Sequence, residues 1–345
     1  MTSFRSHFHR GALVAVALLS LADLASAQNA GLRTLTVAGD IPMTVALFYP
    51  TAAPARTIPM GPWQAIVAPG APATQGPLRG LILISHGTGG TELNHHNLAT
   101  RLASDGYLVA AVRHPGDNWQ DRSMITSGRY FSERPRQLTL VLDALLANPE
   151  WGPRIPAERI GAVGHSAGGY SVLALAGAQA EPQRAAQHCR TVQDDPGFCS
   201  LAKDSSAAPA SGALPAFAAE APAAATARVS VPDRRIRAVV ALAPMAVVFT
   251  AESLSAITVP VRVMMAEGDT VLNGKYHGSY VAANLPRAQS TTVLRAGHFA
   301  FMAQSGIPLP SAAGDAASNP PGFDRMAFLP ELENQVAGFF AEQWR

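Results

Sequence analysis

The chain has 345 residues, of which 48% are hydrophobic and 14% charged, and its formal net charge is +2. The apolar content excludes a chain that is disordered throughout, and the length suits one large α/β domain or two smaller ones. The near-neutral charge gives no reason to expect a nucleic acid or an acidic membrane as partner, and the composition leaves the oligomeric state open.

The N-terminus has the three parts of a secretory signal peptide over residues 1–27. Two arginines precede an apolar run at residues 11–21, and a small-x-small cleavage site ends at Ala27. The apolar run is too short to span a bilayer comfortably, so an uncleaved anchor is the less favoured alternative. We therefore expect a mature domain of residues 28–345, periplasmic or secreted, without stable membrane insertion.

Apolar strands alternate with helical patterns from about residue 78, which is typical of a mostly parallel sheet with helices on both faces. Earlier strands are separated by turns and indicate an antiparallel edge. The expected strands are residues 35–37, 43–50, 64–69, 78–87, 107–112, 159–166, 235–244, 260–269 and 290–298. The expected helices are residues 93–106, 136–151, 167–180 and 329–344. His95 and His96 lie in the first helix, which we expect on the surface, so both side chains should be solvated.

Between residues 181 and 233 this alternation breaks down. The segment holds Cys189 and Cys199, the only two cysteines, followed by a stretch rich in alanine, proline and serine. In an oxidising compartment the two cysteines predict a disulfide; a metal pair is less favoured because His188 is the only further ligand nearby. A long insertion at this place is either a lid over a site or inert, and the sequence leaves both alternatives open.

A serine lies where an apolar strand is expected to run into a helix, in the stretch Gly164-His165-Ser166-Ala167-Gly168. This G-x-S-x-G pattern is typical of a tight strand-to-helix turn that exposes a nucleophilic serine. The glycines are needed because strand and helix approach each other closely there. The pattern predicts that Ser166 is a nucleophile, provided that the chain also supplies a base and an acid.

Both partners follow in the order serine, acid, histidine, each at the end of an expected strand. Asp269 ends the strand at 260–269, and His298 ends the strand at 290–298. Glu267 is the one close rival for the acid, but it lies within the strand rather than at its end. The sequence therefore predicts a Ser166, Asp269 and His298 triad.

Two backbone N–H groups should form an oxyanion hole. We expect one from Ala167, directly after the serine, and one from the glycine-rich turn after the strand at 78–87, where Thr88 is preferred and Gly87 is the alternative. No HxH or HExxH pattern is present in residues 28–345, the expected mature domain, so we expect neither a metal ion nor another cofactor. Four further residues are candidates for the pocket lining, namely His114, His165, Tyr170 and Phe299.

Several stretches carry a family resemblance: "SHGTGGTELNHHNLATRLASDGYLVAAVRHPGDN", "GHSAGGYS", "DRRIRAVVALAP" and "AGHFAF". Together they resemble bacterial α/β-hydrolases of the dienelactone hydrolase-like group, and they are similar to plasma-type platelet-activating-factor acetylhydrolases. The resemblance runs from Thr34 to the C-terminus, apart from the insertion. It implies an α/β-hydrolase fold and serine ester hydrolysis.

The chain departs from both groups in a way that bears on the substrate. Dienelactone hydrolases use cysteine where this chain has Ser166. In the acetylhydrolases the acid follows the strand after the nucleophile's helix, where this chain reads "LAPMAVVF" without a carboxylate, so the acid moves to Asp269. The resemblance therefore implies no particular ester.

The sequence favours an exported serine hydrolase that cleaves short-chain acyl esters or polyester-like substrates through an acyl-enzyme on Ser166. A serine peptidase or amidase and an acyltransferase would use the same residues. A non-catalytic binding protein on the same fold is the alternative from another class, and the complete set of triad candidates disfavours it.

Overall fold

The computed structural model describes residues 28–125, 127–201, 227–311 and 313–345. The predicted signal peptide and residues 202–226 of the predicted insertion lie outside this range. The described strands of the main sheet are β1 (Asn29–Val37), β2 (Met43–Thr51), β3 (Arg56–Met60), β4 (Trp63–Pro69), β5 (Leu81–Ser85), β6 (Leu108–Val112), β7 (Ile160–His165), β8 (Ala238–Leu242), β9 (Val261–Ala266) and β10 (Gln289–Val293).

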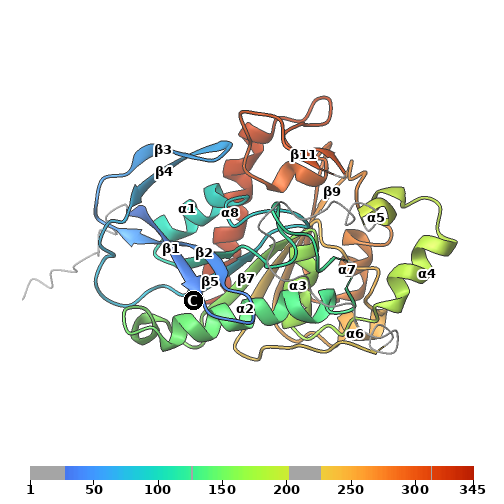
Figure 1. Cartoon of the computed structure of the whole chain (residues 1–345), viewed down its shortest axis with the longest axis horizontal. Helices are drawn as coiled ribbons and strands as arrows, with labels where there is room; N and C mark the ends of the chain where they lie inside the picture. The colour runs from blue at the N-terminus through green and yellow to red at the C-terminus, as the bar shows by residue number, and fades with distance from the viewer. Residues whose placement is uncertain (1–27, 126, 202–226, 312) are drawn as a thin grey trace, which may run out of the picture.

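These strands form one sheet in the order β10-β9-β8-β7-β5-β6-β2-β1-β4-β3 (Figure 1). Strands β5 to β10 pair in parallel, whereas β2 pairs antiparallel with both β6 and β1. Every residue of β5, β6, β7 and β8 is buried, as expected for parallel strands covered on both faces. β3 was not predicted, because Pro59 and its exposed polar positions hide the strand pattern. A small separate hairpin joins β11 (Pro310–Ser311) to β12 (Gly314–Asp315).

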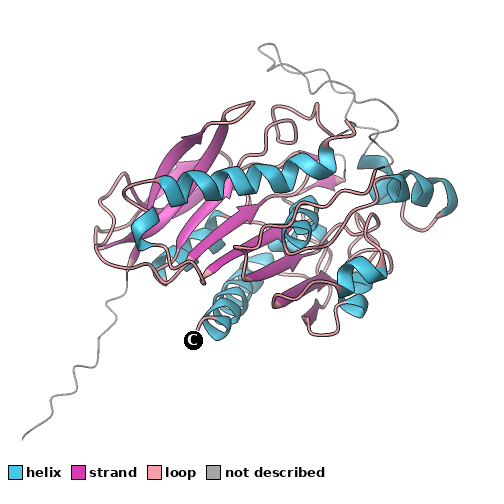
Figure 2. Cartoon of the chain, turned by 90° about the horizontal axis from the view of Figure 1, so that it is seen from below, coloured by secondary structure: helices cyan, strands magenta, loops and turns pink. Residues whose placement is uncertain are grey.

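Helices cover both faces of the sheet (Figures 1 and 2). One apolar core contains buried residues of α2 (Tyr130–Ala147) and α3 (Ala167–Leu175). The core on the opposite face contains buried residues of α1 (His96–Ser104) and α8 (Arg325–Gln343). The remaining helices of the described residues are α4 (Gln183–Thr191), α5 (Pro196–Leu201), α6 (Ala251–Ser255) and α7 (Gly278–Asn284), with 3-10 turns η1 (Gly152–Arg154) and η4 (His298–Phe301). In the described ranges no helix combines the length and apolarity that crossing a membrane requires.

Helix α2 begins at Tyr130, well before the predicted start at residue 136, and it contains Pro135. A proline has no N–H group, so the carbonyl of Phe131 loses its partner within the helix. The Tyr170 hydroxyl donates a hydrogen bond of 2.7 Å to that carbonyl. A contact from the neighbouring helix α3 thus compensates for the proline, which sequence patterning alone does not reveal.

The expectation that His95 and His96 are solvated was wrong. They are 2% and 6% exposed, because this end of α1 packs under the η4 turn. His95 Nδ1–H donates to the Phe301 carbonyl at 3.0 Å, and the His96 ring packs against Trp63. Burial lowers the pKa of each histidine to about 4, so both are neutral near pH 7.

The described part of the insertion holds helices α4 and α5, joined by the predicted disulfide between Cys189 and Cys199. Asp195, between the cysteines, is buried and anchors this region to the chain that follows Asp269. Its Oδ1 accepts a hydrogen bond of 3.0 Å from the N–H of Asn273, and its Oδ2 receives one of 2.9 Å from His277. The cysteine region is therefore fixed to the core in this structure.

Candidate active site

Ser166 lies at the turn between β7 and α3 with φ 56° and ψ −117°, a backbone conformation that L-residues rarely adopt. Its N–H donates to the Leu242 carbonyl at 2.9 Å, and its own carbonyl accepts from the N–H of Met245 at 3.0 Å. Neighbouring backbone therefore holds the strained turn in place, with Ser166 as the residue that precedes the first turn of α3.

The glycines beside Ser166 are required by packing, as the sequence predicted. A Cβ on Gly164 would lie 2.0 Å from the Gly168 carbonyl oxygen, and a Cβ on Gly168 would lie 1.9 Å from the Ser85 carbonyl oxygen. Both distances are far below van der Waals contact. Any larger residue at either position would force the β5 strand, the β7 strand and the α3 helix apart.

Asp269 and His298 meet in the structure. Asp269 Oδ2 accepts a hydrogen bond of 2.8 Å from His298 Nδ1, and both side chains are buried. Asp269 Oδ1 accepts from the N–H groups of Val271 and Leu272 at 2.9 and 2.8 Å, which fixes the carboxylate. Because Nδ1 carries the proton, Nε2 of His298 is left with a lone pair that can accept one.

Glu267, the rival acid, turns away from His298. Its residue is exposed, and its carboxylate accepts from the N–H of Arg295 at 2.8 Å. The geometry thus pairs His298 with Asp269 and not with Glu267.

The glycine-rich turn after β5 faces the first turn of α3. Gly89 N–H donates to Asp117 Oδ1 at 2.7 Å, and Gly90 N–H donates to the Gly87 carbonyl at 3.1 Å. In the residues that the structure describes, the N–H of Thr88 has no hydrogen-bond partner. Ala167 is the first residue of α3, where helix N–H groups lack an intrahelical acceptor. Thr88 and Ala167 therefore each have a backbone donor left over.

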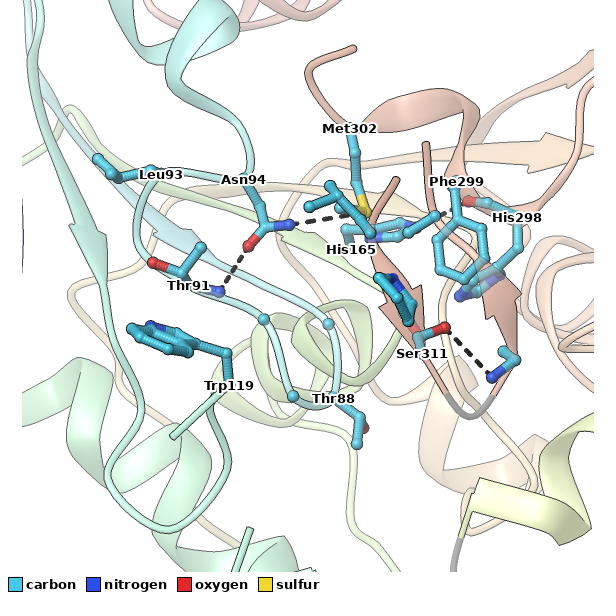
Figure 3. Close-up of a pocket in the computed structure, with 18 of the residues that line it drawn as sticks. Thr88, Thr91, Leu93, Asn94, Trp119, His165, His298, Phe299, Met302 and Ser311 are labelled. Atoms are coloured by element: carbon cyan, nitrogen blue, oxygen red, sulfur yellow. Dashed lines mark hydrogen bonds between the residues drawn. The ribbon is translucent and has the colours of Figure 1, made fainter. Parts of the chain in front are cut away.

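A pocket with a volume of about 580 Å³ opens at this turn, and Ser166 is part of its wall. Thr88 and His298 also line it (Figure 3). The rest of the wall is largely apolar. Trp119 lies on the side opposite His298 and Phe299 (Figure 3), and its side chain is 59% exposed at the rim. Such a concave apolar site with a few polar groups suits a small organic ligand.

Two of the four predicted lining residues, His165 and Phe299, do line this pocket. His165 Nε2–H also donates to the backbone carbonyl of His298 at 2.9 Å, so it supports the histidine loop. Burial, followed by the proximity of His298, lowers the pKa of His165 well below its usual value, which keeps it neutral.

The other two, Tyr170 and His114, are not pocket residues. Tyr170 is fully buried and stacks on Phe249 in the core below α3. His114 is also fully buried, where it hydrogen-bonds to Ser85 Oγ at 2.8 Å and to Gln137 Oε1 at 2.8 Å. Both residues therefore support the site from beneath.

Sequence reasoning missed several wall residues, among them Trp63, Trp119 and Arg122. Trp119 and Arg122 follow β6 in a long loop, and their position after a buried parallel strand was the available signal. Trp63 comes from the β3–β4 hairpin, which no pattern connected with the site. Among the described residues, no group of three or more His, Cys, Asp or Glu side chains is arranged to hold a metal ion.

No protein-family model matches the chain, and no curated protein sequence matches it. Several solved structures, in contrast, are similar to this chain in fold. A ferulic acid esterase from Streptomyces cinnamoneus is similar over 94% of this chain and 92% of its own, with 19% sequence identity and a TM-score of 0.57. A dienelactone hydrolase from Anabaena variabilis matches over 91% of this chain and 98% of its own, with 14% identity and a TM-score of 0.48. The likeness to the esterase, together with the parallel sheet covered by helices on both faces, shows that this chain has the α/β-hydrolase fold.

Proposed function

We propose that this protein is a serine hydrolase that cleaves carboxylic esters. The observation that carries the proposal is the convergence of Ser166, on its strained turn, with the Asp269–His298 pair at one largely apolar pocket. A nucleophile, a base held in one tautomer and two free backbone donors are the parts that acyl transfer needs.

In the proposed reaction, Ser166 Oγ attacks the ester carbonyl while His298 Nε2 takes its proton. Asp269 holds the proton on Nδ1 and stabilises the imidazolium that forms. The N–H groups of Thr88 and Ala167 stabilise the developing oxyanion, and each such donor contributes about 3 kcal/mol to transition-state binding. His298 then protonates the leaving alcohol, and water resolves the acyl-enzyme by the same steps in reverse.

The size and apolar wall of the pocket favour a small apolar substrate or one repeating unit of a polymer. A volume of about 580 Å³ holds a short acyl chain or one unit of a polyester. The predicted signal peptide and the Cys189–Cys199 disulfide both favour an exported protein, since structural disulfides persist in oxidising compartments. We therefore propose short-chain or polyester-like esters met outside the cytoplasm as substrates.

The decisive experiment compares wild type, Ser166→Ala and the control Ser255→Ala on p-nitrophenyl esters from acetate to palmitate. Ser255 lies in α6 at the surface, where its hydroxyl donates to the Glu252 carbonyl at 2.8 Å. We expect a steady rate in wild type and in Ser255→Ala, and none in Ser166→Ala. Esterase activity that survives in Ser166→Ala would contradict the assignment of Ser166 as the nucleophile.

Two related measurements separate the alternatives. Parallel p-nitroanilide substrates distinguish an amidase from an esterase. Labelling by a fluorophosphonate tests for a reactive serine without assuming any substrate. A protein that hydrolyses neither class of substrate and does not react with the phosphonate at Ser166 would contradict the proposed hydrolase and favour the binding-protein alternative.

A further inference from the structure

An arginine without any solvent exposure lies directly beneath the candidate site. Arg134, on α2, forms an ion pair with Asp117, and both side chains are 0% exposed. Neither residue lines the pocket, and neither was singled out by its sequence pattern. A buried ion pair is weak evidence for stability, because removing two charges from water offsets much of their attraction. Its contacts point to another role.

The pair holds the turn that carries Thr88 at both ends. Arg134 Nη2 donates to the backbone carbonyl of His86, just before the turn. Asp117 Oδ1 accepts from the N–H of Gly89, just after Thr88, at 2.7 Å. The ion pair thus holds the His86 carbonyl before Thr88 and the Gly89 N–H after it.

His86 adds a third restraint within the same turn. Its Nε2 accepts from the N–H of His114 at 3.2 Å, so its Nδ1 carries the proton and donates to the Gly87 carbonyl at 2.6 Å. Burial, and then the nearby Arg134 charge, lowers the pKa of His86 well below its usual value. A neutral His86 keeps the lone pair that this arrangement requires.

The same guanidinium reaches the second segment of the site. Arg134 Nε donates to Ser171 Oγ at 3.2 Å, and the Ser171 hydroxyl donates to the Ala167 carbonyl at 3.0 Å. Arg134 is therefore connected to both segments that carry the free N–H groups, the turn of Thr88 and the first turn of α3.

We propose that Arg134 and Asp117 act as one positioning unit that sets the spacing of the two oxyanion donors, Thr88 and Ala167. This inference rests on the proposed ester hydrolysis. The pair touches no substrate and takes no proton. Its effect is exerted through the backbone, where a small displacement of a preorganised donor lowers transition-state stabilisation.

The test uses Arg134→Lys, Asp117→Asn and the double variant. Lysine keeps the charge but cannot reach the separate acceptors of the guanidinium fork, and asparagine keeps an oxygen for Gly89 N–H while removing the charge. Loss of an oxyanion donor lowers kcat by about 10²–10³-fold, so a displaced donor should lower kcat by about 10–100-fold. We expect KM to change by less than about threefold. Because the pair acts as a unit, the loss of kcat in the double variant should be smaller than the product of the losses in the two single variants.

A second readout distinguishes positioning from mere support of the fold. Each variant is titrated with a fluorophosphonate, so that kcat is expressed per reactive Ser166. Inhibition by a trifluoromethyl ketone, which forms the tetrahedral oxyanion, should weaken in proportion to the loss of kcat/KM. Leu332→Ala on α8, fully buried on the opposite face of the sheet, is the control for lost stability with the turn untouched.

Three results would overturn the inference. One is a variant with normal kcat per titrated site, which would show that only folding had suffered, as expected for Leu332→Ala. Another is a loss confined to KM, with unchanged inhibition by the ketone. The third is an inactive wild type, which would remove the proposed function itself and is recognised before any variant is made.

Discussion

Replacing Ser166 by glycine should make the protein more stable than replacing it by alanine, although neither variant retains a nucleophile. The backbone at Ser166 has φ 56° and ψ −117°. The mirror image of this conformation lies in the ordinary extended region, so glycine adopts it as readily as other residues adopt the extended form. Alanine keeps the Cβ that makes the conformation costly.

The magnitude follows from two opposing terms. A residue held in a sparsely populated region costs about 1–3 kcal/mol, which glycine recovers. Glycine loses about 0.5–1 kcal/mol through the greater freedom of its unfolded chain. The net gain of Ser166→Gly over Ser166→Ala is about 1 kcal/mol. In a domain of this size this difference raises Tm by about 1–2 °C.

Thermal unfolding of the two variants, followed by circular dichroism at one protein concentration, measures this difference. Ser166→Ala against wild type reports the loss of the hydroxyl, so Ser166→Gly against Ser166→Ala isolates the strain. A glycine variant that melts at or below the alanine variant would show that the strain at Ser166 does not exceed the roughly 0.5–1 kcal/mol that glycine loses through chain entropy.

Three other expectations follow from the structure. Acid should destabilise the fold, because the unfolded chain protonates His95 near its ordinary pKa while burial lowers the folded pKa to about 4. Between pH 7 and 5 this difference should lower the free energy of unfolding by about 2 kcal/mol. Urea titrations should find that His95→Phe loses about 2 kcal/mol less than wild type over this range. Gly168→Ala should abolish activity and give little soluble protein, since its Cβ would lie 1.9 Å from the Ser85 carbonyl oxygen; expression and phosphonate labelling check this. Replacing Cys189 and Cys199 together by serine should cost up to about 3 kcal/mol, and reduced wild type should lose as much.

The parts of the site that could be predicted are those whose constraints are local or ordered along the chain. Positions 164 and 168 require glycine because of the packing at one strand-to-helix turn, so a short local motif is enough to predict it. Asp269 and His298 could be selected as candidates because parallel strands bring their C-terminal ends to one edge of the sheet, in a known order. The structure brings these two side chains together, and it places both at the pocket that Ser166 lines.

The parts that could not be predicted depend on which face of an element meets which neighbour. His95 and His96 read as surface residues because helix α1 carries polar residues on several sides, and only the position of η4 shows which side is covered. Arg134 and Asp117 read as ordinary charged residues of a helix and a loop. Their pairing depends on how α2 packs under the turn after β5, a contact with no pattern in the sequence.

The described part of the insertion bears on whether residues 181–233 are a lid or an inert addition. Asp195 is buried, and it bonds to Asn273 and His277 in the chain that follows Asp269. The backbone at Gly197 also packs closely on the Thr270 carbonyl. Moving this region as a rigid body would break these hydrogen bonds and leave the buried His277 without its partner, which is costly. In this structure the cysteine region is therefore bonded to the chain that directly follows Asp269, and Asp269 in turn accepts the hydrogen bond from His298.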